Sequence, residues 1–254
     1  MMQQLDHNQS LPGRTHADHA VLVGLGLVKT YGPTVALGGV SIAIREGESV
    51  AVMGPSGSGK TTLLHCLSGI LTLDSGQVLL DDDVSRVRVD GLDAEQRSQL
   101  RRERFGFVFQ QGLLLPELTA QENTALPLML AGVGRRAAEE QARGWLAQLG
   151  LAGMEDRRLG QLSGGQVQRV AIARSQVTGA GVTFADEPTG ALDQATSAEV
   201  LGALLDATVG RGRTLVMVTH DEKVAARCGR TVRLEDGRVV SDSNPLRPAL
   251  DGAA

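Results

Sequence analysis

Aromatic residues, cysteines and long apolar runs are all scarce in this sequence. Only 2% of its 254 residues are Phe, Trp or Tyr, and its two cysteines are Cys66 and Cys228. Because both cysteines lie in segments that read as structured, we expect reduced, buried thiols and a reducing compartment, not a disulfide framework. The longest clean apolar run, 125–133, is far shorter than the roughly 20 residues that cross a bilayer. Any membrane association is therefore expected to come through a partner.

A strong net charge of either sign is also absent. The formal charge is −4 and the pI is about 5.8, so no general attraction to nucleic acid is expected. Residues 1–20 are polar, carry Asp6 and Asp18 and lack the apolar centre of a signal peptide, which predicts a flexible tail. The length and the 42% hydrophobic content suffice for one large domain with an inserted subdomain.

What the sequence does contain is a complete phosphate-binding loop between a strand pattern and a helix pattern. The run 54–61 follows the apolar segment 48–53 and precedes the apolar segment 62–67. Its glycines let successive N–H groups point at an anion, and the helix start adds its positive dipole end. Lys60 is expected to reach the β and γ phosphates of a nucleoside triphosphate, and Thr61 to bind Mg²⁺. The residues expected to contact the nucleotide here are Gly54, Pro55, Ser56, Gly57, Ser58, Gly59, Lys60, Thr61 and Thr62.

Strand-like and helix-like segments alternate along most of the chain, which favours an α/β fold with a largely parallel central sheet. Ligands in such folds lie at the carboxyl ends of the strands. From about 112 to 161 the alternation of strand and helix patterns stops, and 135–149 has the pattern of an amphipathic helix with Trp145 on its apolar side. We therefore expect a helical insertion there. The predicted strands are 20–28, 50–53, 105–109, 182–185, 214–218 and 231–234.

Two adjacent carboxylates end the strand pattern 182–185. Asp186 is expected to hold Mg²⁺, and Glu187 to polarise the water that attacks the γ-phosphate. Adjacent acids also occur at ordinary helix starts, where they complement the helix dipole. The phosphate loop upstream favours the catalytic interpretation.

The segment 162–166 reads as a second helix start, with a capping box from Ser163 to Gln166. Gly164 and Gly165 are unexpected inside a helix and indicate that something approaches the backbone closely. Bare N–H groups at a helix start form a second anion site. Since one compact domain hardly directs both sites at one phosphate chain, we expect two copies arranged head to tail, each completing the other's site.

Taken together and in this order, these segments resemble ATP-binding cassette ATPases over about 21–240. The resemblance implies a P-loop NTPase fold: a RecA-like core with a mostly parallel sheet, an antiparallel β subdomain and the inserted helical subdomain. It implies that Gln110 senses Mg²⁺ and the transport partner, that Asp193 communicates across the dimer, that His220 contacts the γ-phosphate and that Tyr31 stacks on adenine. Residues 241–254 are expected to form a flexible tail. The matching segments are 54–61, 107–110, 162–166, 186–187, 191–193 and 218–220.

Further runs look like the lipoprotein-release and macrolide-exporter subfamily, although Val167, Thr183 and 175–181 depart from its pattern. That likeness implies an ATPase subunit at the cytoplasmic face of the cell membrane, held there by an integral, FtsX-like permease. By analogy, residues 113–117 are expected to line the groove for a permease helix. Two alternatives remain: an ABC ATPase that works without a permease, in translation, repair or assembly, and a regulatory module that holds ATP without turnover.

Overall fold

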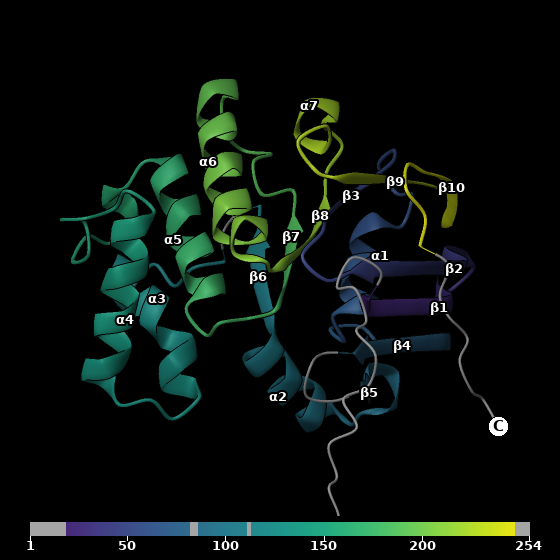
Figure 1. Cartoon of the computed structure of the whole chain (residues 1–254), viewed down its shortest axis with the longest axis horizontal. Coiled ribbons are helices and arrows are strands. Elements are labelled where there is room, and N and C mark those ends of the chain that lie inside the picture. Colours follow the sequence, from purple (N-terminus) through teal and green to yellow (C-terminus); the bar gives the residue numbers. More distant parts are fainter. Residues whose placement is uncertain (1–18, 82–85, 111–112, 247–254) are drawn as a thin grey trace, which may run out of the picture.

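The computed structural model describes residues 19–81, 86–110 and 113–246, and within them the strands form two sheets (Figure 1). The first sheet has six strands in the order β10-β9-β3-β8-β7-β6, and the second has four in the order β2-β1-β4-β5. Most of the expected tails, 1–18 and 247–254, lie outside the described residues. The strands of the first sheet are β3 (Ser49–Met53), β6 (Phe105–Phe109), β7 (Val182–Asp186), β8 (Thr214–Val218), β9 (Arg230–Glu235) and β10 (Arg238–Asp242). Those of the second are β1 (Ala20–Tyr31), β2 (Thr34–Arg45), β4 (Ser75–Asp81) and β5 (Arg86–Arg88).

The six-stranded sheet is parallel from β6 to β9, as the alternating pattern predicts. Its central strands β3 and β8 are short, apolar and buried along their whole length, which is typical of strands covered on both faces. On β8, Val216 and Val218 pack in the cluster that contains α1 (Lys60–Leu67), whereas Leu215 and Met217 pack among the helices on the opposite face. The sheet is therefore the middle layer of the molecule.

The second sheet contains a strand that the sequence predicted without assigning it to a sheet. Strand β1 pairs antiparallel with β2 and β4 and lies outside the central layer. Figure 1 shows α1 between these strands and the central sheet. The reason is local: the chain turns at Gly32, where φ is +58°, and returns along β1 as β2. The antiparallel β subdomain expected from the family resemblance is thus present.

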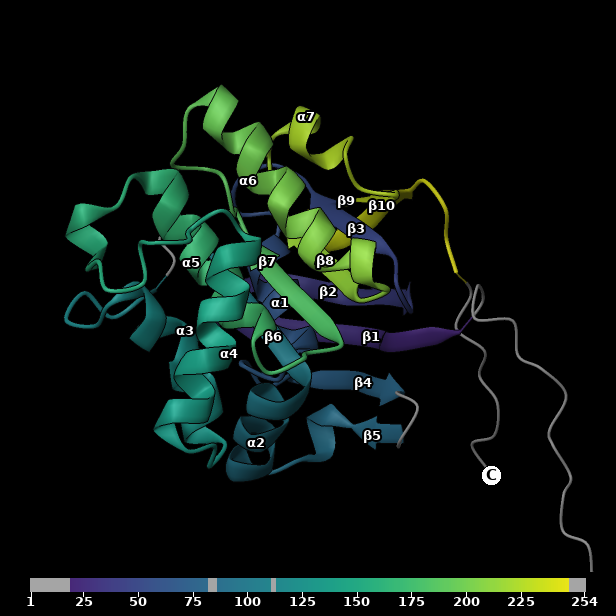
Figure 2. The same cartoon turned by 60° about the vertical axis from the view of Figure 1, so that its left-hand side comes forward.

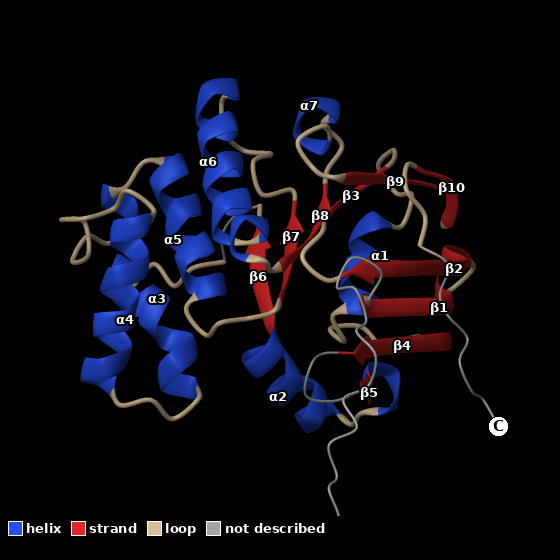
Figure 3. Cartoon of the chain, in the orientation of Figure 1, coloured by secondary structure: helices blue, strands red, loops and turns tan. Residues whose placement is uncertain are grey.

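The helical insertion packs against the helix 164–176, which in turn packs on β6 (Figure 2; helices are blue in Figure 3). The stripe predicted for 135–149 faces inward, because Ala138, Ala142 and Leu146 are fully buried, while Trp145 is half-buried. Arg211 lies over the Trp145 ring at 4.6 Å from its centre. The remaining helices are α2 (Ala94–Arg104), α3 (Ala120–Leu130), α4 (Arg135–Gln148), α5 (Gly164–Gln176), α6 (Gln194–Ala207) and α7 (Glu222–Ala225).

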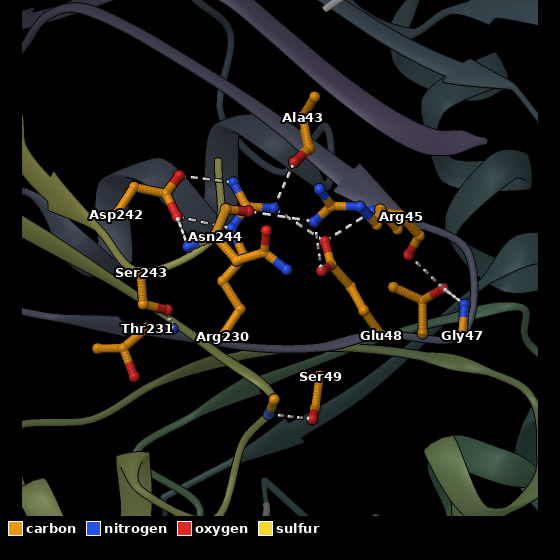
Figure 4. A network of polar contacts seen from close by, with 12 residues as sticks. Ala43, Arg45, Gly47, Glu48, Ser49, Arg230, Thr231, Asp242, Ser243 and Asn244 are labelled. Carbon is orange, nitrogen blue, oxygen red and sulfur yellow. Dashed lines mark hydrogen bonds and ion pairs between the residues drawn. The ribbon is translucent and has the colours of Figure 1, made fainter. Parts of the chain in front are cut away.

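The C-terminal hairpin of β9 and β10 extends into the segment that the sequence assigned to a flexible tail. β10 runs to Asp242, and the Asp242 carboxylate accepts two hydrogen bonds from the buried guanidinium of Arg230 (Figure 4). Residues 241 and 242 therefore belong to the sheet: both pair with β9, and the Asp242 carboxylate neutralises the buried Arg230.

Three further sequence expectations can be compared with the structure. Both cysteines are free, as expected; Cys66 is buried, whereas Cys228 is half-buried and meets that expectation only in part. Burial raises the pKa of each thiol to about 11. Thr183 is a polar residue within the apolar strand β7. Its buried hydroxyl is satisfied because Oγ1 accepts a hydrogen bond of 2.7 Å from Gln176 Nε2. Within the described ranges, no helix combines the length and apolar character needed to cross a bilayer.

Candidate functional site

The phosphate loop joins the end of β3 to the start of α1, and backbone from two other segments holds it. A Cβ on Gly54 would lie 2.0 Å from the carbonyl oxygen of Leu234, and one on Gly59 would lie 2.2 Å from that of Ala36. Both glycines also have positive φ, 149° and 98°, so no other residue fits without movement. The N-cap of α1 is Gly59, with no side-chain cap, which leaves the first N–H groups of the helix free for an anion.

Two buried polar groups of the loop are poised for a ligand. Lys60 is 9% exposed, and its ammonium donates hydrogen bonds of 2.9 Å to the carbonyls of Gly54 and Pro55. The Ser58 hydroxyl oxygen is buried and has no hydrogen-bond partner among the described residues. A buried, unsatisfied hydroxyl beside a lysine suits a phosphate, which accepts from both.

The Thr61 hydroxyl and the Asp186 carboxylate lie close together at the N-terminus of α1. Thr61 Oγ1 donates a hydrogen bond of 3.3 Å to Asp186 Oδ1 at the end of β7. Burial raises the pKa of Asp186, and the bond from Thr61 and the charge of His65 act in the opposite direction. An oxygen-only set with one partly buried carboxylate fits a hard divalent cation such as Mg²⁺, which would relieve the desolvation of that carboxylate.

Glu187 lies directly after Asp186 and turns toward β8. Its φ of +48° is unusual for a residue other than glycine, and its N–H donates to the carbonyl of Val218 at 3.0 Å. The Glu187 carboxylate lies 2.8 Å from Nδ1 of His220, which follows β8 and is 69% exposed. The structure thus brings together the two residues that the sequence placed at the γ-phosphate, on the rim of a pocket of about 460 Å³.

Gln110 reaches the same region from β6. Phe109 pairs with Asp186 across the parallel strands, so Gln110 emerges beside Glu187. Its side chain lies against Gly190, where a Cβ would be 3.1 Å from Gln110 Nε2. Gln168 of α5 donates to the Phe109 carbonyl at 2.9 Å and fixes the strand end. Sequence reasoning missed this glutamine; its only signal was a polar residue at a position that faces the buried side of α5.

The segment 163–166 lies apart from the phosphate loop. Its capping box is confirmed: Ser163 Oγ accepts from the N–H of Gln166, and Gln166 Oε1 accepts from the N–H of Ser163. Figure 1 shows α5 and α1 on opposite sides of β7 and β8. The structure therefore does not bring Ser163, Gly164, Gly165 and Gln166 to the loop of the same chain.

Contacts within the same chain partly explain why Gly164 and Gly165 are glycines. A Cβ on Gly165 would lie 2.4 Å from Cγ2 of Thr196, and one on Gly164 would lie 3.1 Å from a methyl of Leu192. The backbone is thus approached closely, as predicted, by residues at the start of α6. Asp193 caps that helix by accepting from the N–H groups of Ala195 and Thr196.

Tyr31 ends β1 and is 48% exposed. The ammonium of Lys29 lies 5.8 Å from the centre of its ring, and Asp74 holds Lys29 with a hydrogen bond of 2.8 Å. An exposed ring on a fixed strand suits stacking on a base. Its contact with adenine stays a prediction.

The sheet order, the loop after β3 and the paired acids after β7 define the class of P-loop NTPases. Residues 37–190 match the ABC transporter family. The chain is 44% identical over 218 residues to a macrolide export ATP-binding/permease protein, MacB, of Hyphomonas neptunium, covering 86% of this chain and 33% of that protein. It is 46% identical over 219 residues to a pyoverdine export ATP-binding/permease protein, PvdT, of Pseudomonas aeruginosa, covering 85% and 32%. The chain thus spans about a third of these relatives' length.

Solved structures agree with the sequence comparisons. The ATP-binding cassette MJ0796, described as dimeric, post-hydrolysis and bound to ADP and Pi, superposes with a TM-score of 0.79 at 37% identity, covering 89% of this chain and 99% of that one. CbiO1 of Clostridium perfringens, described as part of an ABC transporter complex, gives 0.78 at 28% identity, covering 89% of each chain. The chain belongs to the ABC transporter family.

Proposed function

We propose that this chain binds ATP with Mg²⁺, hydrolyses it in a head-to-tail dimer and thereby drives a membrane permease. The observation that carries the proposal is the convergence of Lys60, Asp186 and the Glu187–His220 pair at the carboxyl ends of β3, β7 and β8. These groups come from distant parts of the sequence, and their meeting at one sheet edge is the arrangement that phosphoryl transfer requires.

Each polar group then has a task in binding. Lys60 exchanges its two loop carbonyls for phosphate oxygens, Ser58 and the free N–H groups of α1 donate to the same phosphates, and Tyr31 stacks on the base. Thr61, Asp186 and Gln110 would hold Mg²⁺. Bound there, Mg²⁺ supplies charge neutralisation for the transferring phosphoryl group.

Glu187 is the group that handles the proton of the attacking water. It is 19% exposed, fixed by its backbone bond to β8 and hydrogen-bonded to His220. A carboxylate held in this way polarises a water without first reorganising, and His220 carries its other ring nitrogen toward the γ-phosphate.

A second copy would complete the site. The helix start at Ser163 lies away from the loop of its own chain, and the similar cassette MJ0796 is described as a dimer. In a head-to-tail pair, Ser163, Gly164, Gly165 and Gln166 of one copy face the nucleotide held by Lys60 of the other, and Asp193 lies at the junction.

The permease surface that we propose is a groove of about 370 Å³ between α2, β6, α3 and the end of α5. Its lining includes the exposed side chains of Ile70 and Leu130 and the rings of Phe107 and Phe109. Residues 113–117 lie next along the chain and stay a prediction for the same contact. The export proteins MacB and PvdT are ATP-binding/permease proteins, which favours an FtsX-like permease and a place at the cytoplasmic face of the membrane over an ATPase without a permease.

Glu187→Gln tests the proposal. We expect hydrolysis to fall on the order of 10² to 10⁴-fold, as for loss of a general base, while ATP binding persists and a dimer accumulates. Phosphate release measures the first effect, and size-exclusion chromatography with ATP measures the second. The control Glu140→Gln, on the exposed face of α4, retains wild-type turnover. Full turnover by Glu187→Gln would remove Glu187 from the role of base.

A further inference from the structure

The turn between β9 and β10 lies between the phosphate loop and β2, and it bonds to both. The N–H of Gly237 donates to the carbonyl of Ser58 at 3.1 Å, and the carbonyl of Gly237 accepts from the N–H of Gly38 at 2.8 Å. One residue near the C-terminal end of the domain therefore joins the loop that faces the phosphates to a strand of the other sheet.

The backbones of the loop, the turn and β2 approach one another closely. A Cβ on Gly237 would lie 2.8 Å from the carbonyl oxygen of Ala36, the same oxygen that would lie 2.2 Å from a Cβ on Gly59. Gly237 also has a φ of +71°, which favours glycine. The Ala36 carbonyl oxygen thus contacts both the phosphate loop at Gly59 and the turn at Gly237. A shift of the turn would therefore displace Gly59, the N-cap of α1.

The other end of the hairpin is anchored to the same strand, β2 (Figure 4). Arg230 is 2% exposed and donates from Nη1 to the carbonyl of Ala43 at 2.8 Å and to Glu48 Oε1 at 3.0 Å. Its Nε and Nη2 donate to the Asp242 carboxylate at 2.8 and 2.6 Å. If the hairpin slid along β2, this ion-pair network would break. The hairpin is therefore held at its open end by Arg230 and Asp242 and at its turn by the hydrogen bonds of Gly237.

We propose that Gly237 is a positioning residue of the nucleotide site: with the hairpin held by Arg230 and Asp242, it keeps the Ser58–Gly59 segment in the shape that presents its N–H groups to phosphate. This rests on the proposed function. The hairpin touches none of the reacting groups, and Glu187 and His220 approach from β7 and β8. Its contribution therefore belongs to nucleotide binding and not to the chemical step.

The test is Gly237→Ala in the full chain, with Gly212→Ala as the matched control. Gly212 has nearly the same φ, +72°, but a Cβ there meets nothing within 4 Å. Both variants carry the same backbone strain, and only Gly237→Ala presses on Ala36. We expect the Kd for a fluorescent ATP analogue with Mg²⁺ to rise about 10 to 100-fold in Gly237→Ala, as for the loss of one or two charge-assisted hydrogen bonds to phosphate, and to stay unchanged in Gly212→Ala. KM for ATP rises in parallel, and kcat at saturation is retained.

Equal affinities in the two variants would overturn the proposal, as would a loss of kcat with an unchanged KM. Should Gly237→Ala not fold, hydrogen exchange of the wild-type protein decides: nucleotide should slow exchange of the Gly237 N–H, whose acceptor is in the loop, and leave that of Gly212 unchanged. Protection of the loop without protection of Gly237 contradicts the positioning role. If the wild-type chain does not bind the nucleotide at all, the proposed function fails instead.

Discussion

Two helical glycines lead to opposite predictions at the scale of the single residue. Gly165 in α5 is buried, and a Cβ there would lie 2.4 Å from Thr196, so Gly165→Ala forces α5 and α6 apart. We expect a loss of about 1–3 kcal/mol, as for overpacked cores. Gly144 in α4 is exposed with nothing within 4 Å of its Cβ position, and Gly144→Ala should stabilise the protein by about 0.5–1 kcal/mol. Urea unfolding of both variants measures the difference, and equal stabilities would show that the helix contact is loose.

Single residues of the site also show which of its features could be predicted from the sequence. The capping box from Ser163 to Gln166 and the acid pair at 186–187 depend on neighbours a few residues away, and the structure shows both. The constraints on Gly54, Gly59 and Gly165 come from Leu234, Ala36 and Thr196, which are distant in sequence. A pattern indicates that a glycine is needed, but only tertiary structure shows which atoms approach it.

At the scale of the element, Asn123 connects a loop to a helix. It is fully buried in α3, and its Nδ2 donates to the carbonyls of Leu115 and Thr119 while its Oδ1 accepts from the N–H of Leu115. Asn123→Ala leaves these backbone groups unpaired, and we expect a loss of about 2–4 kcal/mol from several buried groups at about 1–3 kcal/mol each. The control Asn244→Ala removes an exposed side chain and should change stability by less than about 0.5 kcal/mol. Thermal or urea unfolding of the pair gives the result, and a stable Asn123→Ala would mean that this loop is held by other contacts.

The elements that the sequence predicted best are short apolar strands of the parallel sheet. Strands β6 and β8 were predicted with the observed bounds, because short apolar runs between turns are typical of parallel strands, although β6 lies at the edge of the sheet and is only partly buried. β1 was predicted as a strand without a sheet, and β10 was not predicted: its last two residues, 241–242, were taken as tail because the sequence there is polar. Its place in the sheet depends on Arg230, a long-range partner that periodicity does not show.

At the scale of the whole molecule, the separation of α5 from the phosphate loop makes a prediction that no single-chain site would make. If Ser163 serves the nucleotide of its partner, then a Lys60→Met chain and a Ser163→Asp chain fail for different reasons and rescue one another. In a mixed dimer, one site carries both changes and the other carries neither. Aspartate is as good an N-cap as serine, so Ser163→Asp preserves α5 while its carboxylate repels the partner's phosphates. Ser163→Asn, a neutral cap, controls for the change of shape and should keep most of its activity.

Each variant alone should release little phosphate. Equal mixing gives half mixed dimers with one intact site each, so we expect the mixture to recover about a quarter of the wild-type rate if the sites act independently. Mixing Lys60→Met with Glu187→Gln is the decisive control, because both residues serve the same nucleotide, and their mixed dimer has a defect in each site. Recovery in the first mixture but not in the second assigns Ser163 to the opposite copy, whereas no recovery in either, with mixed dimers present by crosslinking, contradicts the shared site.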